Sequence, residues 1–586
     1  MLKRTLLCLL ACALVCCAAA AETVPPMPTP PPALQSFTAD LVLYYNPDGG
    51  QKYHLDPSCP SVHARYLPLS GQFIYAQLTG EPYAALQPCA FCGAPQPPVT
   101  EAPALDMPAA ADYLPAPFGV TTWRGDSFRT NAAVGTLPEA PTGLALVWQA
   151  ETGVRPGSGG FPDAGFSWYS QPAIVKWPVE VRRSMALTEE ARNTTALKEV
   201  IFASLDGSIH FLNLADGTAT REAIAVGQPM LGAVTLHPLA YPLLMAGQYV
   251  RPSVTTGSGL RWYDLTDGGL LYAFDGRVGE ELSGAFNTSA LIDRSTGAAL
   301  SLSKDGYLYL QPMQPGFFAT GSRELTMAVS FNPPFWTKLT DGSETVTSAP
   351  VAYGSRLWFG TSRGRILCAD AVTKERLWSA QLSAQGGVIN SLAMELTDDG
   401  HLLLYAGVST NAGTQPIPMQ LTCLDADTGE SLWTCKVFDD LGLFYAGTLA
   451  ACAVGENALD GLVFFTLSNV RTDGRRSPGL VLALDKATGG IRWQHEMPGE
   501  CRSAPVAVYT ADGHGWIVQT DEDGCMVLLD GLTGKRVASL LLEGGRWSSP
   551  AVFGDMLVIG CCVYVDALPA GGRIYGVRLT GSETTE

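Results

Sequence analysis

The most regular feature of the chain is an alternation of apolar and polar positions, followed by a polar turn and a second short run with a large aromatic residue. The clearest copy runs from Gly364 to Trp378, and further copies end at Trp433 and Trp493. In all three copies the Trp lies eight residues after an Asp. An alternation with a period of two predicts strands. The Asp, followed four residues later by Gly429 and Gly489 in the second and third copies, predicts a tight turn between them.

Weaker copies of this unit keep the turn and lose the Trp. Their turns begin at Asn213, Asp264 and Asp530. Counting the strands that precede such turns gives eight units, spaced roughly 50 residues apart. Units of this length bury their faces only against neighbouring units. The sequence therefore predicts an all-β fold, an eight-bladed β-propeller over residues 144–586.

The two ends of the predicted propeller complement each other. After residues 572–579 no further strand is available to form the outer edge of the last unit. Residues 144–149 have the pattern of an outer strand but nothing before them to pair with. We therefore expect this N-terminal strand to complete the last blade, which leaves no open edge.

A second marker accompanies the units, because Ser-x-Pro opens the inner strand at Ser348, Ser503 and Ser548. Together with the later Gly-x-Leu-x-Ala-Leu-Asp-x-x-Thr-Gly-x-x-x-Trp, it resembles the pyrroloquinoline quinone (PQQ) repeat. Quinoprotein dehydrogenases and non-enzymatic BamB-like propellers share this repeat, and the resemblance covers residues 144–586. It implies that the repeated Trp residues dock between blades and are structural: Trp378, Trp433 and Trp493.

Residues 1–21 have the make-up of an export signal. Two basic residues precede an apolar run, and small residues end it at Ala21, where we expect cleavage. A lipoprotein-type cut before Cys12, which would leave a lipid anchor, is the alternative. Residues 22–38 are rich in Pro and predict an extended linker. No later segment has about 18 uninterrupted apolar residues, so we expect an exported chain without a transmembrane span.

Residues 39–96 predict a small module with its own metal site. A hairpin pattern leads to His54, Cys59 follows, and the knuckle Pro-Cys-Ala-Phe-Cys-Gly supplies Cys89 and Cys92. Thiolates and imidazole suit Zn²⁺, and a module this small needs a cross-link such as a bound metal to be stable. We predict a zinc-ribbon-like module with these four residues as ligands. Four protein ligands leave no open position, so the zinc would be structural.

Two alternatives stay open for this module. His63 competes with His54 as the fourth ligand, and in an oxidising compartment two of the cysteines could form a disulfide with the third as a spare thiol. The order Tyr53-His54, Cys59 and a distal Pro-Cys-x-x-Cys at 88–92 is distantly similar to the metal-binding domain of Ada-type proteins. That resemblance implies a metal-binding role for the module.

Residues 97–143 show little periodicity and predict a linker that packs on the propeller. Within them, Arg124-Gly125-Asp126 invites an interpretation as an adhesion motif. Three residues recur by chance, however, and no other feature supports adhesion. We expect Trp123 and Phe128 to pin the segment onto the propeller.

The charge balance excludes one class of partner. The chain has 37 Lys and Arg against 55 Asp and Glu, a formal net charge of −18. This balance argues against binding to nucleic acid or to an anionic membrane surface through bulk electrostatics. With 47% apolar and only 16% charged residues, the chain has ample material for a large core.

The chain carries few signs of catalysis. Cys561-Cys562 resembles the vicinal disulfide that alcohol-oxidising quinoproteins carry beside their cofactor. Here, however, the pair follows the second strand of a blade, at the position that Thr361-Ser362 occupies in another blade. The calcium-binding set and the catalytic Asp of that family have no counterparts at matching places. No phosphate loop is present. We expect neither enzymatic activity nor bound PQQ.

The sequence therefore predicts an exported, non-enzymatic propeller that acts as a binding or scaffolding protein at the cell envelope, periplasmic or on the cell surface, or outside the cell. The alternatives are a PQQ-dependent quinoprotein oxidoreductase and, as a narrower form of the scaffold, a BamB-like envelope assembly factor. The expected partner is a protein or a polysaccharide that meets the blade-connecting loops or the central channel.

Overall fold

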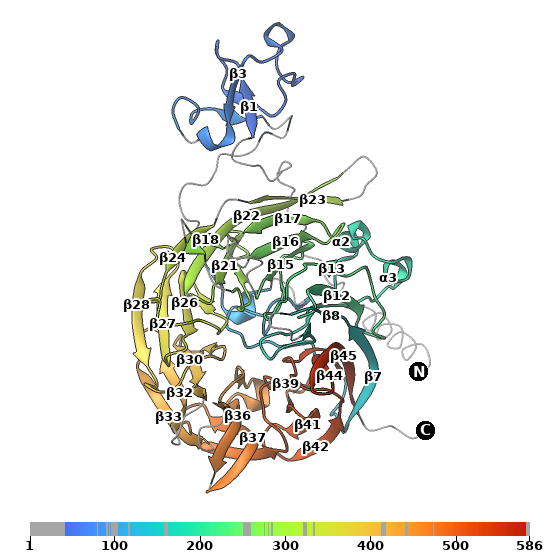
Figure 1. Ribbon diagram of the computed structural model, residues 1–586, viewed down its shortest axis with the longest axis vertical. Helices are drawn as coiled ribbons and strands as arrows, with labels where there is room; N and C mark the ends of the chain where they lie inside the picture. Colours follow the sequence, from blue (N-terminus) through green and yellow to red (C-terminus); the bar gives the residue numbers. More distant parts are fainter. Residues whose placement is uncertain are drawn as a thin grey trace, which may run out of the picture.

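The computed structural model describes residues 41–581, with gaps at 79, 90–91, 93, 95–103, 115–117, 158–161, 250–258, 275, 279–280, 283–284, 320–324, 332–333, 412–417, 440–443 and 473. The predicted export signal, the alternative cut at Cys12 and the Pro-rich linker at 22–38 lie outside the described residues. Figure 1 shows a small N-terminal sheet and a large ring of sheets.

The ring is a β-propeller, so the predicted all-β fold class is confirmed. Within the described residues its strands form eight antiparallel groups of four, which we number blades 1 to 8. The first four are β10 (Ala173–Val175), β11 (Glu199–Ala203), β12 (Ser208–Asn213) and β13 (Ile224–Ala225); β14 (Thr235–Leu236), β15 (Leu243–Gly247), β16 (Leu260–Asp264) and β17 (Leu270–Phe274); β20 (Leu291–Ile292), β21 (Ala298–Leu302), β22 (Tyr307–Ala319) and β24 (Phe335–Lys338); and β25 (Val351–Tyr353), β26 (Arg356–Gly360), β27 (Arg365–Asp370) and β28 (Arg376–Gln381).

The other four blades follow in chain order. They are β29 (Ala393–Leu396), β30 (Leu402–Gly407), β32 (Pro418–Asp425) and β33 (Ser431–Asp439); β35 (Ala453–Val454), β36 (Leu462–Thr472), β37 (Arg475–Asp485) and β38 (Ile491–Met497); β39 (Val506–Tyr509), β40 (Gly515–Thr520), β41 (Cys525–Asp530) and β42 (Arg536–Leu541); and β43 (Ala551–Phe553), β44 (Met556–Val565), β45 (Leu568–Thr580) and β7 (Gly143–Thr152). Pairing of β33 with β36 joins blades 5 and 6 into one sheet.

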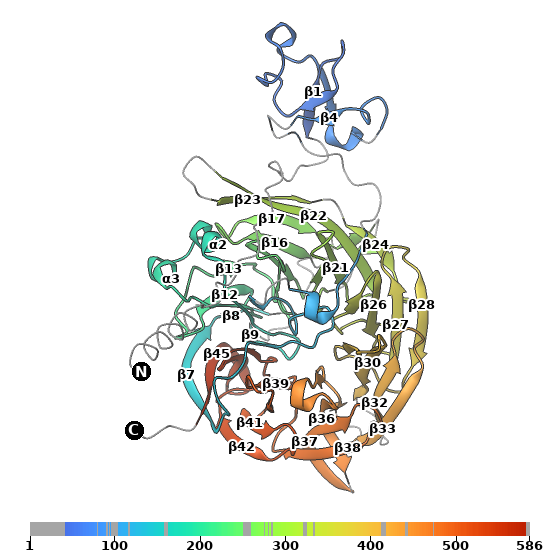
Figure 2. The same ribbon diagram turned by 180° about the vertical axis from the view of Figure 1, so that it is seen from behind.

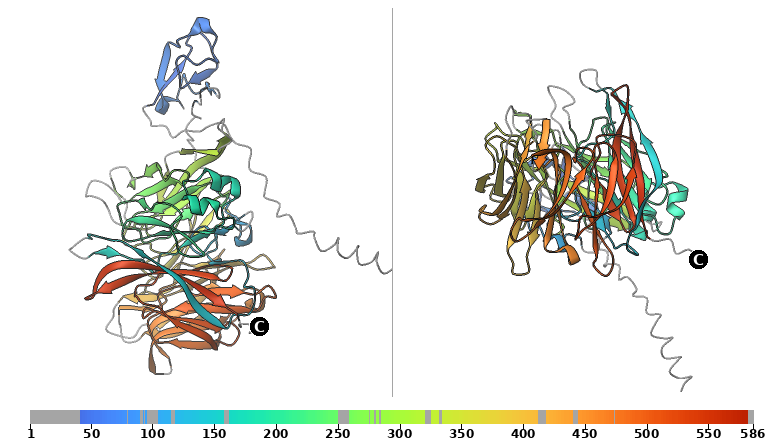
Figure 3. Two further views of the ribbon diagram at one scale, coloured as in Figure 1. Left: turned by 90° about the vertical axis from the view of Figure 1, so that its right-hand side faces the viewer. Right: turned by 90° about the horizontal axis from the view of Figure 1, so that it is seen from below.

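Additions to this plan are few. In blade 3 the long strand β22 also pairs with β23 (Leu325–Phe331), which extends the sheet outward. Two short helices, α2 (Val179–Ser184) and α3 (Glu189–Asn193), lie between the first two strands of blade 1. Figure 3 shows the resulting disc from two sides.

An N-terminal strand closes the ring, as predicted. β7 pairs antiparallel with β45 from Gly143 opposite Thr580 to Thr152 opposite Gly572. In Figure 1 the cyan β7 lies along the red strands of the last blade. Residues from the two ends of the propeller therefore share one sheet, and blade 8 has no missing strand.

Tryptophans join neighbouring blades along the rim. At four junctions an outer-strand Trp stacks on the turn Gly of the next blade, where a Cβ would overlap the indole. Each indole N–H also donates to a carbonyl of that turn, so the docking role that the repeat implied is confirmed. The pairs are Trp148 with Leu214 (2.8 Å), Trp378 with Ala426 (3.1 Å), Trp433 with Lys486 (2.6 Å) and Trp493 with Gly531 (2.9 Å).

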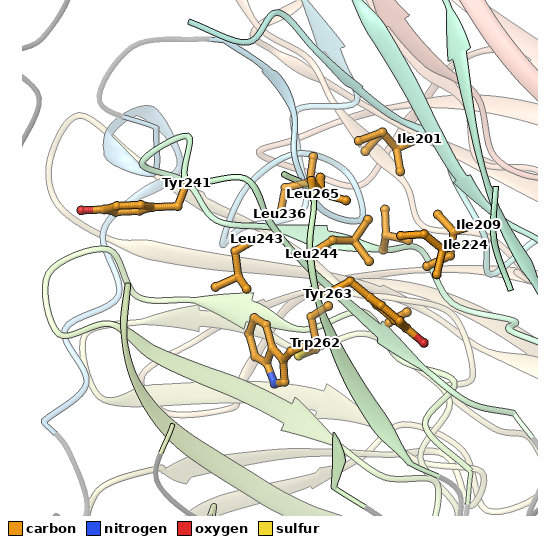
Figure 4. Packing of buried hydrophobic residues seen from close by; sticks show 14 of the residues in the cluster. Ile201, Ile209, Ile224, Leu236, Tyr241, Leu243, Leu244, Trp262, Tyr263 and Leu265 are labelled. Atoms are coloured by element: carbon orange, nitrogen blue, oxygen red, sulfur yellow. The ribbon is translucent and has the colours of Figure 1, made fainter. Parts of the chain in front are cut away.

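The core consists of apolar side chains between the faces of adjacent blades. Figure 4 shows this packing where Ile201 and Ile209 of blade 1 approach Leu244 and Tyr263 of blade 2, and all four are buried. Along each strand, successive side chains point to opposite faces of the blade. Each blade therefore packs against one neighbouring blade on each of its two faces.

The N-terminal sheet is separate from these blades. Its strands lie in the order β3-β1-β2-β4, formed by β1 (Val42–Tyr45), β2 (Lys52–His54), β3 (Gly71–Ile74) and β4 (Gln87–Pro88). Phe73 and Tyr83 stack at 4.2 Å between ring centroids and fill its small core.

Candidate metal centre and the central channel

The N-terminal sheet places the predicted zinc ligands at one end of its central strands. β2 ends at His54, and its parallel pairing with β4 sets Tyr53 opposite Pro88. Cys89 follows that pair, and its N–H donates to the carbonyl of Tyr53 (3.0 Å). Cys59 lies in the tight turn after β2, where its N–H donates to the carbonyl of Asp56 (3.1 Å).

His54, Cys59, Cys89 and Cys92 come together, and their ligand atoms all lie within 4.8 Å of one another. The Sγ atoms of Cys59 and Cys89 are 4.0 Å apart, and Cys92 Sγ is 3.7 Å from His54 Nδ1. A tetrahedral zinc with Zn–S bonds of about 2.3 Å holds its ligand atoms about 3.8 Å apart. The donor set and its spacing therefore fit Zn²⁺, whose binding stays a prediction.

The surroundings of the cluster suit metal ligation. Burial lowers the pKa of His54, with a smaller effect from Lys52, and this favours the neutral imidazole that a metal binds. The N–H of Leu55 points at Cys92 Sγ (3.3 Å), and Ser61 Oγ lies 3.1 Å from Cys59 Sγ and 3.2 Å from Cys89 Sγ. These donors would stabilise thiolates that share a cation.

His63, the competing fourth ligand, lies outside the cluster. Its side chain is exposed and caps a short 3-10 helix at Ala64–Tyr66, where Nδ1 accepts from the N–H of Arg65 (3.3 Å). The structure therefore brings His54, not His63, to the three cysteines. All three are free thiols, so the alternative disulfide is not formed here.

A second candidate site, the central channel, is occupied by the chain itself. We call residues 118–137 the axial segment. Figure 2 shows this part of the chain crossing the middle of the ring. Its short strands β5 (Gly119–Val120) and β6 (Ala133–Val134) pair with the inner strands β10 and β43 of blades 1 and 8.

Backbone bonds tie the axial segment to further inner strands. Its carbonyls accept from the N–H groups of Leu236, Ala352 and Met394, in blades 2, 4 and 5. The N–H of Leu137 donates to the carbonyl of Tyr509 in blade 7 (2.7 Å). The segment therefore contacts most of the ring from within, well beyond the packing expected of a linker.

The charged residues of the axial segment are fully buried. Arg129 donates to the carbonyls of Trp123 (2.8 Å), Pro350 (2.9 Å) and Ser289 (3.0 Å), and Arg124 to that of Pro505 (3.1 Å). Burial lowers the pKa of both guanidinium groups to about 10. The two arginines therefore bridge backbone groups of different blades.

Sequence reasoning did not assign this role to the arginines. The expectation that Trp123 and Phe128 pin the segment is consistent with the structure, since both are buried. One sequence feature could have indicated that this segment is buried: a dense group of large side chains at 123–129 within a Pro- and Ala-rich stretch. Arg124 and Asp126 are only 1% and 2% exposed, so this triplet cannot present itself to an adhesion receptor.

Trp123 lies at the centre of this arrangement. It packs in a cluster of small residues from the loops that open the inner strands, namely Ala233, Ala349, Ala450, Ala451 and Ala504. The channel expected to receive a ligand is therefore filled at this level by a side chain of the protein itself.

The residues around Cys561 and Cys562 do not fit a quinone cofactor. Both thiols are buried and free on β44, and neighbouring strand residues point to opposite faces. A Cβ at Gly544 would overlap Cys561, and one at Gly165 would overlap Cys562, so backbone covers each side of the pair. A planar cofactor therefore has no room beside these cysteines.

Among the described helices, none is both long and apolar enough to cross a membrane.

A family model described as outer membrane protein assembly factor BamB matches residues 267–437 and 418–585, together more than half of the 586 residues. Among curated proteins, the β-alanine-activating enzyme of Danio rerio is 35% identical over 88 residues. That match covers 14% of this chain and 7% of the enzyme, so the chain spans less than a tenth of that relative.

Solved structures also match. BamB from Moraxella catarrhalis is 13% identical with a TM-score of 0.44, over 75% of this chain and 99% of that chain. The quinohemoprotein alcohol dehydrogenase from Comamonas testosteroni is 12% identical with a TM-score of 0.39, over 80% of this chain and 81% of that chain. A europium-containing methanol dehydrogenase is 13% identical with a TM-score of 0.39, over 79% and 98%.

Proposed function

The chain belongs to the family of the outer membrane protein assembly factor BamB, and from this premise we propose that it is an exported, non-enzymatic propeller that binds other proteins at the cell envelope. Its rigid ring would hold partners on the loops that join the blades. The zinc-stabilised module at residues 39–96 would be a second, independent contact surface.

One observation carries the non-enzymatic assignment. The axial segment fills the middle of the ring, and its polar groups form hydrogen bonds with the surrounding protein. Arg129 alone donates to the carbonyls of Trp123, Pro350 and Ser289. Among the described residues, the cluster that could hold a metal is the one in the N-terminal module. Its four ligands leave no position for a substrate.

Calorimetric titration of the purified chain with PQQ and calcium tests this assignment. We expect no heat of binding and no reduction of an electron-accepting dye. Tight, saturable quinone binding with dye reduction would contradict the proposal and favour an oxidoreductase.

Cross-linking of whole cells of the producing organism, followed by purification of the chain from its envelope fraction, tests the scaffold role. We expect a protein partner in a fixed ratio to the chain, and a mature N-terminus at Glu22. Retention by a polysaccharide with no protein partner would change the ligand class, and recovery from the cytoplasm with an intact N-terminus would contradict export.

A further inference from the structure

The three cysteines of the N-terminal cluster differ in burial and in spacing. Cys59 is 0% and Cys89 2% exposed, and both belong to the small core of the module. Their Sγ atoms are 4.0 Å apart. Cys92 is only half-buried, and its Sγ accepts from the N–H of Leu55 (3.3 Å) and lies 3.7 Å from His54 Nδ1. The cluster therefore consists of a buried thiol pair and one outer thiol.

The buried pair is placed for a disulfide. An S–S bond is about 2.05 Å long, so the two Sγ atoms would approach by about 2 Å. Cys59 lies in the turn that follows β2, and Cys89 directly follows β4, so both lie outside the paired strands. A bond between them would join the same two segments that a zinc ion would join. Either cross-link could therefore hold this small module together.

The outer thiol is the one that a small solute meets first. Cys92 is the only one of the three cysteines that is not fully buried. Its sulfur lies within 4.8 Å of the sulfur atoms of Cys59 and Cys89. Cysteines that respond to oxidants are solvent-accessible and have a second thiol beside them, which converts the oxidised sulfur into a disulfide. The cluster has both features.

We propose that this cluster is a thiol-oxidation site in which Cys92 takes up a two-electron oxidant, such as hydrogen peroxide, and Cys59 and Cys89 hold the resulting disulfide. The Cys92 thiolate attacks one peroxide oxygen and a hydroxide ion leaves, which gives a sulfenic acid. The Cys89 thiolate displaces the hydroxyl group of that acid as a second hydroxide and forms a Cys89–Cys92 disulfide. The Cys59 thiolate then attacks Cys89 Sγ, and Cys92 leaves as a thiolate. Cys59 and Cys89 have then lost two electrons, which reduced the peroxide to two hydroxide ions.

Oxidation would exchange one cross-link of the module for the other. His54 and Cys92 are only two of the four zinc ligands, so a bound zinc ion would leave. The disulfide would keep the module folded, with Cys92 as a free, half-buried thiol. Zinc and a disulfide, which the sequence left open as alternatives, would thus be the reduced and the oxidised state of one cluster. This chemistry goes beyond the proposed function, because it needs no envelope partner.

Peroxide treatment of the purified, zinc-loaded full chain tests the site. We expect a chromogenic chelator to record the release of about one zinc per chain. Peptide mapping after alkylation should find Cys59 joined to Cys89, with the loss of two hydrogen atoms, and Cys92 alkylated. Dithiothreitol with added zinc should restore the metal. Because this mapping uses the wild-type chain, it decides the pairing whether or not the variants fold.

Variants test the route through Cys92. After zinc has been removed by a chelator, Cys92→Ser should form the Cys59–Cys89 disulfide at least tenfold more slowly than the wild type. The matched control Cys435→Ser removes a half-buried thiol of the propeller and should leave that rate within twofold. Cys89 joined to Cys92 as the final product, no disulfide in the module, or an unchanged rate in Cys92→Ser would each overturn the proposal. If the chain carries no zinc and the Cys59–Cys89 disulfide still forms, the thiol-oxidation site stands and the zinc prediction fails.

Discussion

The indole N–H of Trp148 donates to the carbonyl oxygen of Leu214, 2.8 Å away, across the seam where blade 8 meets blade 1. Trp148 is 7% exposed, and its indole rests on the turn at Gly217. We predict that Trp148→Ala destabilises the propeller by about 3–5 kcal/mol, because a large buried ring and its hydrogen bond are lost. Urea unfolding measures this. Val147→Ala, on the exposed neighbour, should change the free energy of unfolding by less than about 0.5 kcal/mol.

The turn glycines that receive these indoles give a second prediction. Gly489 has a φ of 70°, and a Cβ there would overlap Trp433. Gly489→Ala should cost roughly 2–4 kcal/mol through backbone strain and overpacking. Gly490→Ala is the control, since its φ is not positive and its Cβ would meet only Thr488 Oγ1 at 3.3 Å. Equal melting temperatures of the two variants would refute the role of this contact.

Removal of a buried arginine should loosen the ring. Arg129→Met would leave backbone carbonyls of blades 3 and 4 without their donor, so we expect a loss of about 3–5 kcal/mol of folding free energy. Arg492→Met removes an arginine whose side chain is 62% exposed and should cost less than about 1 kcal/mol. Guanidinium unfolding followed by tryptophan fluorescence compares the two. A loss below 1 kcal/mol for Arg129→Met would show that the axial segment is dispensable for stability.

The zinc prediction is tested on the purified full chain by elemental analysis. We expect about one zinc per chain in the wild type and none after Cys89→Ser, because a tetrahedral site loses a ligand. His63→Gln should keep its zinc. Absence of zinc from freshly purified, reduced wild-type protein would leave the cluster without a metal function, and loss of zinc in His63→Gln would revive His63 as a ligand.

His237 should make the propeller sensitive to acid. Burial lowers its pKa to about 3, and its ring contacts Tyr241 edge-on at 5.0 Å. Between that value and the usual pKa near 6.5, the unfolded chain binds the proton and the folded chain does not, so stability falls as the pH falls. At pH 4 the loss from this residue is roughly 3 kcal/mol. His237→Phe should flatten the difference in unfolding free energy between pH 7 and pH 4, whereas His401→Gln, on an exposed side chain, should not.

Most of the propeller could be predicted because its units repeat a local rule. The turns at Asn213, Asp264, Asp425, Asp485 and Asp530 each close with a bond from the N–H four residues on. Strand and turn chemistry act over a few residues and are visible in the sequence. The ligand cluster of the N-terminal module could also be proposed, because the spacing of Cys89 and Cys92 limits where those thiols can lie.

The axial segment could not be derived in the same way. Its partners, such as Pro350 and Pro505 for Arg129 and Arg124, lie hundreds of residues away. It has few strand residues and no period, so local patterning predicts only a linker. For the same reason the sequence could not decide between His54 and His63 as the fourth ligand. The parallel pairing of β2 with β4 places His54 beside Cys89, and that pairing is not visible in local patterning.

Both closing devices, β7 and the axial segment, precede blade 1 in the chain but bind strands of blade 8. During synthesis β6 of the axial segment and β7 emerge early, and their strand partners β43 and β45 are made last. Such long sequence separations slow folding, because loop entropy is lost before the contacts form. The strands of the propeller that leave the ribosome first are therefore among the last to form their backbone hydrogen bonds. A chain that stops before residue 551 would keep both β6 and β7 unpaired and exposed to chaperones or proteases.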